Sequence, residues 1–315
     1  MAELAREAAR LWGLGDAPIE LAAQRENMVY RVVASEGDFA LRFHRPGYRS
    51  EAELRSELEW TAMLAQGGLS VPAPKRSQSG RLIERAGECL VDLLTWLPGE
   101  GLGKAGEMRG VADRAGFCRQ LGAAMARLHD LSDGWALPEE FTRPAWDRAG
   151  LLGEAPLWGR FWEHPHLSAD DTALFLAARA AADAALARLE GHADYGLIHA
   201  DLLSENMLWD GARLSFIDFD DGGFGFRDFE LATFLLRYEE VPDYETLRAA
   251  LCEGYGARRV VEPGALDLFM LLRALTYPGW IAERLDEPGA EERSRRAVSV
   301  ARRVARRWLT KYGGA

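Results

Sequence analysis

The sequence predicts an α+β fold with two lobes, a small β-rich N-terminal lobe and a larger helical C-terminal lobe. Short alternating runs rich in Val, Phe, Tyr and Leu occupy the first hundred or so residues, as in β-strands. Long segments with an apolar period of 3.6 residues fill most of the remaining chain, as in helices. The turn-forming run Leu97–Gly101 separates the two patterns. We therefore expect an N-terminal lobe at 1–97 and a C-terminal lobe at 98–315.

The composition is that of a folded protein with an acidic surface. Of the 315 residues, 48% are hydrophobic and 28% are charged, which is enough for a sizeable core. The formal net charge of −11 argues against a general nucleic-acid or membrane binder and is compatible with a cationic or neutral substrate. The three cysteines are widely spaced and form no metal-binding pattern, so reduced thiols in a cytoplasmic protein are expected. No signal peptide or membrane span is predicted.

The N-terminal lobe is expected to hold strands and two helices. An amphipathic helix is expected over Met1–Gly13 and a longer helix over Glu51–Gln66, which Gly67 and Gly68 stop. An extended linker follows at Val71–Pro74. The expected strands are Ile19–Ala23, Met28–Ala34, Asp38–His44, Arg81–Ile83 and Cys89–Trp96. The turn Gln24–Asn27, where a nucleotide-cradling loop would lie, contains no glycine.

The C-terminal lobe is expected to be helical around one irregular segment. The expected helices are Gly110–Asp130, Ala169–Glu190, Phe226–Tyr238, Asp243–Tyr255, Gly264–Leu285 and Glu291–Tyr312. Residues 132–165 are irregular and rich in Trp and Phe, and they either line a substrate cleft or pack on the lobe. His164 and His166 are expected in a surface turn rather than at a metal. The last helix is basic, and we expect it to dock on an acidic lobe with its arginines in water.

The chemically informative residues are concentrated in the stretch Leu197–Asp221. It contains His199, Asp201 and Asn206, and a strand-like run then leads to Asp218. The order and spacing match the protein-kinase pattern H-x-D-L-x-x-x-N followed by Asp-Phe. In that pattern one carboxylate accepts a proton from the attacking hydroxyl, while the Asn and the second carboxylate hold Mg²⁺ on the phosphates. Each half alone is usually structural, but the two together predict a kinase-type site.

A cation for the phosphates is predicted in the third strand. Strand alternation places Ala40 and Arg42 on one face, as in the kinase strand V-A-I-K, with Arg in place of Lys. Arg can bind phosphate oxygens through two donors, but it is bulkier than Lys. Glu57 is the expected partner of Arg42, with Glu53 and Glu59 as alternatives. A strand arginine that points into solvent is the competing interpretation.

These motifs resemble the family of aminoglycoside phosphotransferases and choline kinases, whose members share a protein-kinase-like two-lobed fold. The likeness covers nearly the whole chain, from Met28–Val32 to the last helices, and its most specific parts are Ile198–Leu208 and Phe216–Asp221. The pieces Leu41–Tyr48 and Arg143–Trp162 look closer to the branch with stress-response kinase A and the kinase-like homoserine kinases.

The resemblance implies roles for the motif residues. Asp201 would be the catalytic base, or would orient the substrate hydroxyl. Asn206 and Asp218 would be the Mg²⁺ ligands. Arg42 would hold the phosphates of ATP and be steadied by Glu57, which makes the N-terminal lobe the nucleotide-binding one.

Supporting positions are also implied by the resemblance. The adenine hinge would be formed by Thr95, Trp96 and Leu97. His199 would support the catalytic loop without touching substrate. Glu230 lies where the family usually has an Asp before Leu-Ala, and it would brace the catalytic loop from below.

Asp220 takes the place of the glycine in the protein-kinase Asp-Phe-Gly motif, which favours the small-molecule branch of the family. Asp220 could add to the metal shell, or could attract a cationic substrate together with Asp221. The expected function is therefore transfer of the γ-phosphoryl group of ATP, with Mg²⁺, to a hydroxyl of a small molecule such as an amino alcohol, homoserine, a sugar or an aminoglycoside. A Ser/Thr protein kinase of the stress-response type and a nucleotide-binding pseudokinase are the alternatives. No nucleic-acid or membrane partner is expected, and the sequence indicates no oligomeric state.

Overall fold

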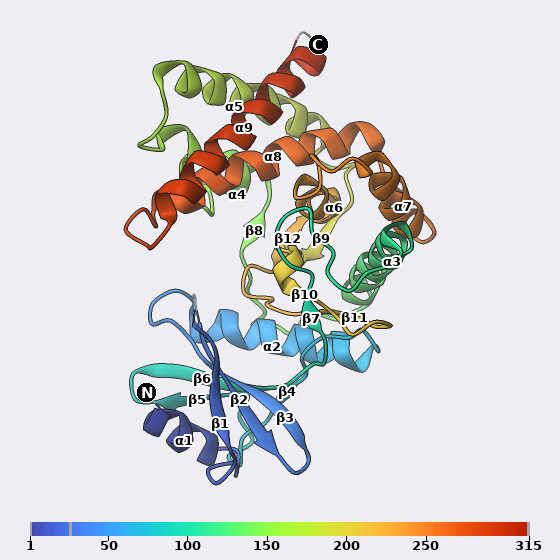
Figure 1. Ribbon diagram of the computed structural model, residues 1–315. Helices are drawn as coiled ribbons and strands as arrows, with labels where there is room; N and C mark the ends of the chain where they lie inside the picture. The colour runs from blue at the N-terminus through green and yellow to red at the C-terminus, as the bar shows by residue number, and fades with distance from the viewer. Residues whose placement is uncertain (1, 25–26, 314–315) are drawn as a thin grey trace.

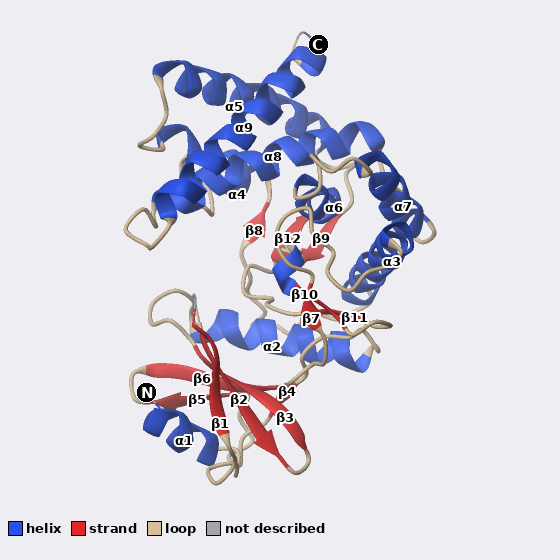
Figure 2. Cartoon of the chain, in the orientation of Figure 1, coloured by secondary structure: helices blue, strands red, loops and turns tan. Residues whose placement is uncertain are grey.

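The computed structural model describes residues 2–24 and 27–313. An antiparallel sheet from the first third of the chain forms one end of the molecule, and helices from the rest form the other (Figures 1 and 2). This arrangement confirms the predicted α+β fold. The exact boundary between the lobes at residue 97 stays a prediction.

Among the described residues, the N-terminal sheet runs in the order β1-β2-β3-β6-β4, with β5 paired to β6. Helix α1 (Ala2–Arg10) places Ala5 and Ala8 against the apolar side of this sheet, which includes Val32 and Leu41. Helix α2 (Glu51–Gln66) begins with a Ser50 capping box and lies between the sheet and the helical part. The strands are β1 (Ile19–Gln24), β2 (Met28–Ala34), β3 (Gly37–Phe43), β4 (Pro74–Lys75), β5 (Ile83–Ala86) and β6 (Cys89–Thr95).

Three boundaries in this lobe differ from the prediction. Strand β5 covers Ile83–Ala86 instead of Arg81–Ile83, because a tight turn at Gly87 (φ 58°) joins it to β6 and sets Ala86 opposite Cys89. The linker includes the short strand β4, which pairs with Leu94 and Leu93. Helix α1 ends at Arg10, before the predicted Gly13. Two residues of the turn Gln24–Asn27, at 25 and 26, lie outside the described residues.

The helices of the C-terminal part pack around one large apolar core. Helix α3 begins at Arg114, later than predicted, because Asp113 caps it by accepting a hydrogen bond from the Gly116 N–H. Helix α8 is apolar for most of its length, as expected for a central helix of this core. The main helices are α3 (Arg114–Asp133), α5 (Ala169–Leu189), α6 (Arg227–Leu236), α7 (Tyr244–Gly256), α8 (Pro263–Ala282) and α9 (Ala290–Tyr312).

Short strands hold the motif stretch against these helices. One small sheet has the order β11-β10-β7 and the other β8-β12-β9 (Figure 2). Strand β9 leads into the loop with His199, and the β10–β11 hairpin separates Asn206 from Asp218. Strand β12 follows the acidic residues at 218–221. Their bounds are β7 (Glu100–Gly101), β8 (Ala145–Trp146), β9 (Tyr195–Ile198), β10 (Met207–Trp209), β11 (Leu214–Phe216) and β12 (Gly223–Phe226).

The aromatic segment 132–165 contains more structure than predicted. Strand β8, helix α4 (Arg148–Leu152) and a 3₁₀ turn at Phe161–Glu163 lie within it. Trp146 and Phe161 are buried in the core, whereas Trp158 lines the cavity described below. The segment therefore both packs on the lobe and lines a cavity. The surface turn predicted for His164 and His166 is present, with Pro165 and His166 exposed, but the exposure expected of His164 is wrong. His164 is buried, and its Nε2 lies 3.1 Å from the hydroxyl of Ser294 on α9.

The last helix docks on acidic residues as expected, but only some of its arginines, such as Arg295 and Arg306, point into water. Arg302 forms a bidentate pair with Asp171 at 2.5 and 2.7 Å, and Arg303 bonds Glu239 at 2.8 Å. These pairs fix α9 to α5 and to the end of α6 because each acid lies on or beside a neighbouring element. No helix among the described residues is both long and apolar enough to cross a membrane.

Candidate active site

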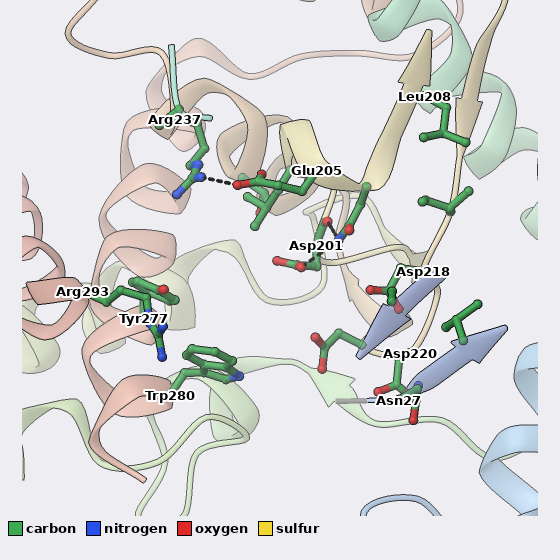
Figure 3. Close-up of a pocket in the computed structure, with 18 of the residues that line it drawn as sticks. Asn27, Asp201, Glu205, Leu208, Asp218, Asp220, Arg237, Tyr277, Trp280 and Arg293 are labelled. Carbon is green, nitrogen blue, oxygen red and sulfur yellow. Dashed lines mark hydrogen bonds and ion pairs between the residues drawn. The ribbon is translucent and has the colours of Figure 1, made fainter. Parts of the chain in front are cut away.

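A cavity of about 1460 Å³ lies between the sheet and the helices (Figure 3). Its walls combine Ala40 and Arg42 of β3 with Asp201, Asp218 and other residues of the helical part. Figure 3 shows the Asp201 and Asp218 side chains projecting into the same space, with Tyr277 and Trp280 of α8 at its other end. The motif residues that the sequence placed together are therefore together in space.

The loop that carries Asp201 is strained and braced from below. Ala200 has φ 66°, in the left-handed region that non-glycine residues rarely adopt. The Glu230 carboxylate accepts hydrogen bonds from the N–H groups of His199, at 2.6 Å, and of Ala200, at 3.4 Å. The His199 ring donates from Nε2 to the carbonyl of Ile217 at 2.9 Å, and burial lowers its pKa to about 4, so it stays neutral. These contacts fix the loop to the end of strand β11.

The Asp201 carboxylate is held at both oxygens. Arg273 donates from Nη2 to Oδ1 at 2.6 Å, and the Asn206 amide donates to Oδ2 at 3.0 Å. Burial raises the pKa of Asp201, and the Arg273 guanidinium opposes that rise. Arg273 also stacks on the Trp158 ring, with its Cζ 4.6 Å from the ring centroid. Arg273 belongs to no sequence motif, and its one signal in the sequence is that it interrupts the apolar run of α8.

Asp218 has the properties of a ligand for a divalent cation. Its φ of 67° is left-handed. Its side chain is exposed to the cavity. Desolvation by the surrounding protein is the main cause that raises its pKa to about 8, and the charges of Asp220 and Asp201 add to it. No described residue donates a hydrogen bond to its carboxylate, and none donates to the amide oxygen of Asn206. Oxygen ligands and uncompensated negative charge are what Mg²⁺ and Ca²⁺ prefer.

The next two carboxylates already have a cation of the protein beside them. Arg49, immediately before α2, approaches Asp221 at 3.2 Å and Asp220 at 3.7 Å. Burial raises the pKa of both carboxyls to about 6. Arg49 therefore balances part of the charge that could have attracted a cationic substrate to this pair.

Arg42 is buried and points into the protein, so the solvent-facing interpretation is wrong. Its Nη1 donates to Glu57 at 2.8 Å, while Nε and Nη2 donate to Asp92 at 2.8 and 2.7 Å. Asp92 is fully buried and also accepts from His44 Nε2 at 2.7 Å. Two carboxylates therefore share the one guanidinium. Glu53, an alternative partner, belongs instead to the α2 capping box.

The segment expected to be the adenine hinge lines the cavity. Thr95, Trp96 and Leu97 all contribute to its wall. The N–H of Thr95 donates to the Ala73 carbonyl and that of Trp96 to the Asp38 carbonyl, both at 2.9 Å. These two N–H groups are thus engaged within the protein, which limits what the segment can offer a ligand.

Replacing Glu230 by Gln should change how stability depends on pH. Burial raises the Glu230 pKa from 4.5 to about 7, so the folded state holds a proton that the unfolded chain releases. The resulting stability is present below pH 4.5 and is lost as the pH rises through about 7. Glu230→Gln cannot ionise but keeps an oxygen for the two N–H groups. We expect the variant to gain on the order of 3 kcal/mol relative to the parent between about pH 5 and about pH 8. Urea unfolding at both pH values would measure this gain, and parallel curves for the two proteins would contradict it.

Comparisons with known proteins agree with this geometry. The model of the phosphotransferase enzyme family matches residues 19–269. A homoserine kinase of Methylorubrum populi (strain ATCC BAA-705 / NCIMB 13946 / BJ001) is 28% identical, over 83% of this chain and 82% of that protein. A solved structure of a microcompartment-associated aminopropanol kinase is 27% identical, covers 99% of both chains and has a TM-score of 0.86.

A more distant structure shows the same fold with ligands. It is an amicoumacin kinase, hAmiN, in complex with AMP-PNP, Ca²⁺ and Ami, at 21% identity, 94% and 91% coverage and a TM-score of 0.75. Together the comparisons confirm the family that the motifs predicted, including the likeness to homoserine kinases. The chain belongs to the phosphotransferase enzyme family, and it is a kinase that transfers a phosphoryl group to a hydroxyl of a small molecule.

Proposed function

We propose that the donor is ATP, that the metal is Mg²⁺ and that Asp201 faces the acceptor hydroxyl. The observation that carries the proposal is the convergence of Asp201, Asn206 and Asp218 on one cavity whose opposite wall holds Arg42. Phosphoryl transfer depends mainly on positioning and charge neutralisation, and this set supplies both. Asp201 would accept the hydroxyl proton, and its contacts with Arg273 and Asn206 would hold it in place.

Asn206 and Asp218 would hold the metal, whose chemistry is to neutralise charge on the phosphate oxygens. In the part of the chain that the structure describes, nothing donates to the amide oxygen of Asn206 or to the carboxylate of Asp218, which supports this assignment. The bound AMP-PNP and Ca²⁺ of the amicoumacin kinase support a nucleotide with a divalent cation. Mg²⁺ is the proposed ion because it binds hard oxygen ligands together with substrate phosphates.

The nucleotide would lie along the N-terminal wall of the cavity. Arg42 would contact phosphates through the N–H bonds that its two carboxylates leave free, and Glu57 would keep it in place. The base would lie beside Thr95, Trp96 and Leu97, where Leu208 and Ile217 form an apolar floor. His199 and Glu230 would act through the loop without contacting either substrate.

We propose a small amino alcohol as the acceptor. The similarity to the aminopropanol kinase over 99% of both chains supports this class. The acceptor would occupy the end of the cavity formed by Trp158, Tyr277 and Trp280, beyond Asp201 (Figure 3). The acids at this end of the cavity are already paired with arginines, Glu205 with Arg237 at 2.9 Å and Glu287 with Arg293 at 2.8 Å, so the acceptor class rests on the similarity alone.

The test is ADP release with ATP, Mg²⁺ and a panel of amino alcohols, homoserine, sugars and aminoglycosides. We expect one amino alcohol to stimulate ADP release and to be recovered as its phosphate ester. Asp218→Asn should lower the metal-dependent rate about 100-fold or more, because it removes the charged ligand while keeping its shape. Asp210→Asn, in an exposed turn beyond β10, is the control and should keep the parent rate. A panel without any stimulated turnover, or an Asp218→Asn enzyme with full activity, would refute the proposal.

A further inference from the structure

The guanidinium of Arg143 lies at the centre of a contact between α2 and the loop that follows Asp218. Its side chain is completely buried. The guanidinium donates mainly to backbone carbonyls, and its partners are Gly222 O at 2.6 Å, Phe219 O at 2.9 Å, Asp220 O at 2.6 Å and Glu53 O at 3.1 Å. Three of these four carbonyls belong to residues 219–222, the loop that follows Asp218, which we call the acidic loop.

Burying an arginine that is bound mostly to backbone carbonyls is energetically unfavourable. Removing a cation from water is unfavourable, and among the described residues only Glu57, at 3.7 Å, lies close enough to form an ion pair with it. Burial accordingly lowers the pKa of Arg143. What this arrangement provides is geometry, because the planar guanidinium has five donors in fixed directions. It fixes the carbonyls of Phe219, Asp220 and Gly222 relative to one another.

The loop needs such a restraint because it begins with a strained residue. Asp218 has φ 67°, a strained conformation that a non-glycine residue keeps only where its surroundings enforce it. Beyond it, the Gly222 N–H donates to the Phe219 carbonyl at 2.9 Å and closes a tight turn. Arg143 binds the same carbonyl and two others in this turn. It therefore opposes relaxation of Asp218 toward an ordinary backbone conformation.

The same guanidinium also reaches α2, the helix whose Glu57 pairs with Arg42. It binds the Glu53 carbonyl of α2, and its Nη1 lies 3.7 Å from Glu57 Oε2. The other oxygen of Glu57 accepts from Arg42. Phe219 adds an apolar contact in this direction, since its ring meets Trp60 of α2 edge-on, with ring centroids 5.2 Å apart. One side chain thus connects the proposed metal loop with the proposed phosphate-binding pair.

We propose that Arg143 is a positioning residue that fixes the Asp218 carboxylate for the divalent cation and sets its distance from the Arg42–Glu57 pair. It touches neither the nucleotide nor the metal and acts through the backbone of the loop. The inference rests on the proposed metal-binding role of Asp218.

The test is Mn²⁺ binding in the presence of a non-hydrolysable ATP analogue. Binding is measured through the loss of the electron paramagnetic resonance signal of free Mn²⁺. Arg143→Lys and Arg143→Met should bind Mn²⁺ about 10- to 100-fold more weakly than the parent, the range found for residues that orient metal ligands. Arg227→Lys is the matched control, because Arg227 is equally buried and bonds the Leu197 carbonyl and Asp133, away from the acidic loop. It should lose stability but keep the parent's Mn²⁺ affinity.

The outcomes separate this inference from the function on which it rests. Parent-like Mn²⁺ affinity in a folded Arg143→Lys protein overturns the positioning role while leaving the metal site intact. An equal loss of affinity in Arg227→Lys also overturns it, because the effect would then follow general destabilisation. A parent that binds no Mn²⁺ with the analogue overturns the metal role of Asp218 and the present proposal together. The Lys variant keeps the charge and most of the volume, so it carries the test if Arg143→Met does not fold.

Discussion

Asp201→Asn should lower kcat about 100- to 10,000-fold while the protein still binds the ATP analogue, which is the loss expected for a general base. The substitution keeps the size of the side chain and one oxygen that can accept from Arg273 or Asn206. It removes the ability to accept the proton of the acceptor hydroxyl, together with the negative charge that faces Arg273. The effect should therefore appear in kcat, with little change in the KM for ATP.

Two further measurements make this result specific. A thermal shift with the ATP analogue and Mg²⁺ should be the same for Asp201→Asn and the parent, because nucleotide contacts on the opposite wall are untouched. Glu205→Gln changes a neighbouring acid of the same loop, which pairs with Arg237 at 2.9 Å, and should lower kcat far less. An Asp201→Asn enzyme with parent-like kcat would remove Asp201 from the reaction and leave the choice of base open.

The parts of the site that the sequence predicted share one property, which is that their spacing along the chain is fixed by the chemistry. His199, Asp201 and Asn206 lie on one short loop, and a single hairpin brings Asp218 back beside them. The alternation of β3 likewise placed Ala40 and Arg42 on the cavity side. Local periodicity also gave the order of the long helices and their approximate ends.

The residues that the sequence did not reveal come from distant segments and carry no local motif. Arg273 and Arg143 reach the site across 72 and 77 residues of chain, to Asp201 and Asp220 respectively. Arg143 looks like an ordinary arginine until the fold places it beside the carbonyls, whereas Arg273 stands out only as a charge inside an apolar helix. Asp92 had a weak signal, since an acid inside the apolar strand C-L-V-D-L-L-T requires a buried partner. His164 was misjudged for the same reason, because its partner Ser294 lies 130 residues away.

Asp92→Asn should destabilise the protein by about 3–5 kcal/mol, the cost of removing one member of a buried charge cluster. Asp92 has no solvent exposure and binds three donors, two from Arg42 and one from His44. The Arg42 guanidinium and the His44 ring hold the pKa of its carboxyl far below the usual range, so it is ionised in the folded protein. An amide offers only one acceptor oxygen and turns its own NH₂ toward the remaining donors. The free energy of unfolding in urea measures the loss.

The control is Asp38→Asn, which alters a half-buried pair with Arg31 in the same sheet and should cost less than about 1 kcal/mol. The triple change Arg42→Met, Asp92→Leu and Glu57→Gln should recover much of the stability, because it removes both carboxylates that share the guanidinium, and apolar residues of similar size often replace a buried ion pair without loss. The same triple variant should bind the ATP analogue more weakly, since the proposed phosphate cation is gone. Recovery of stability without recovery of binding would show that the cluster is retained for the nucleotide. A triple variant that binds the analogue like the parent would assign the cluster to folding alone.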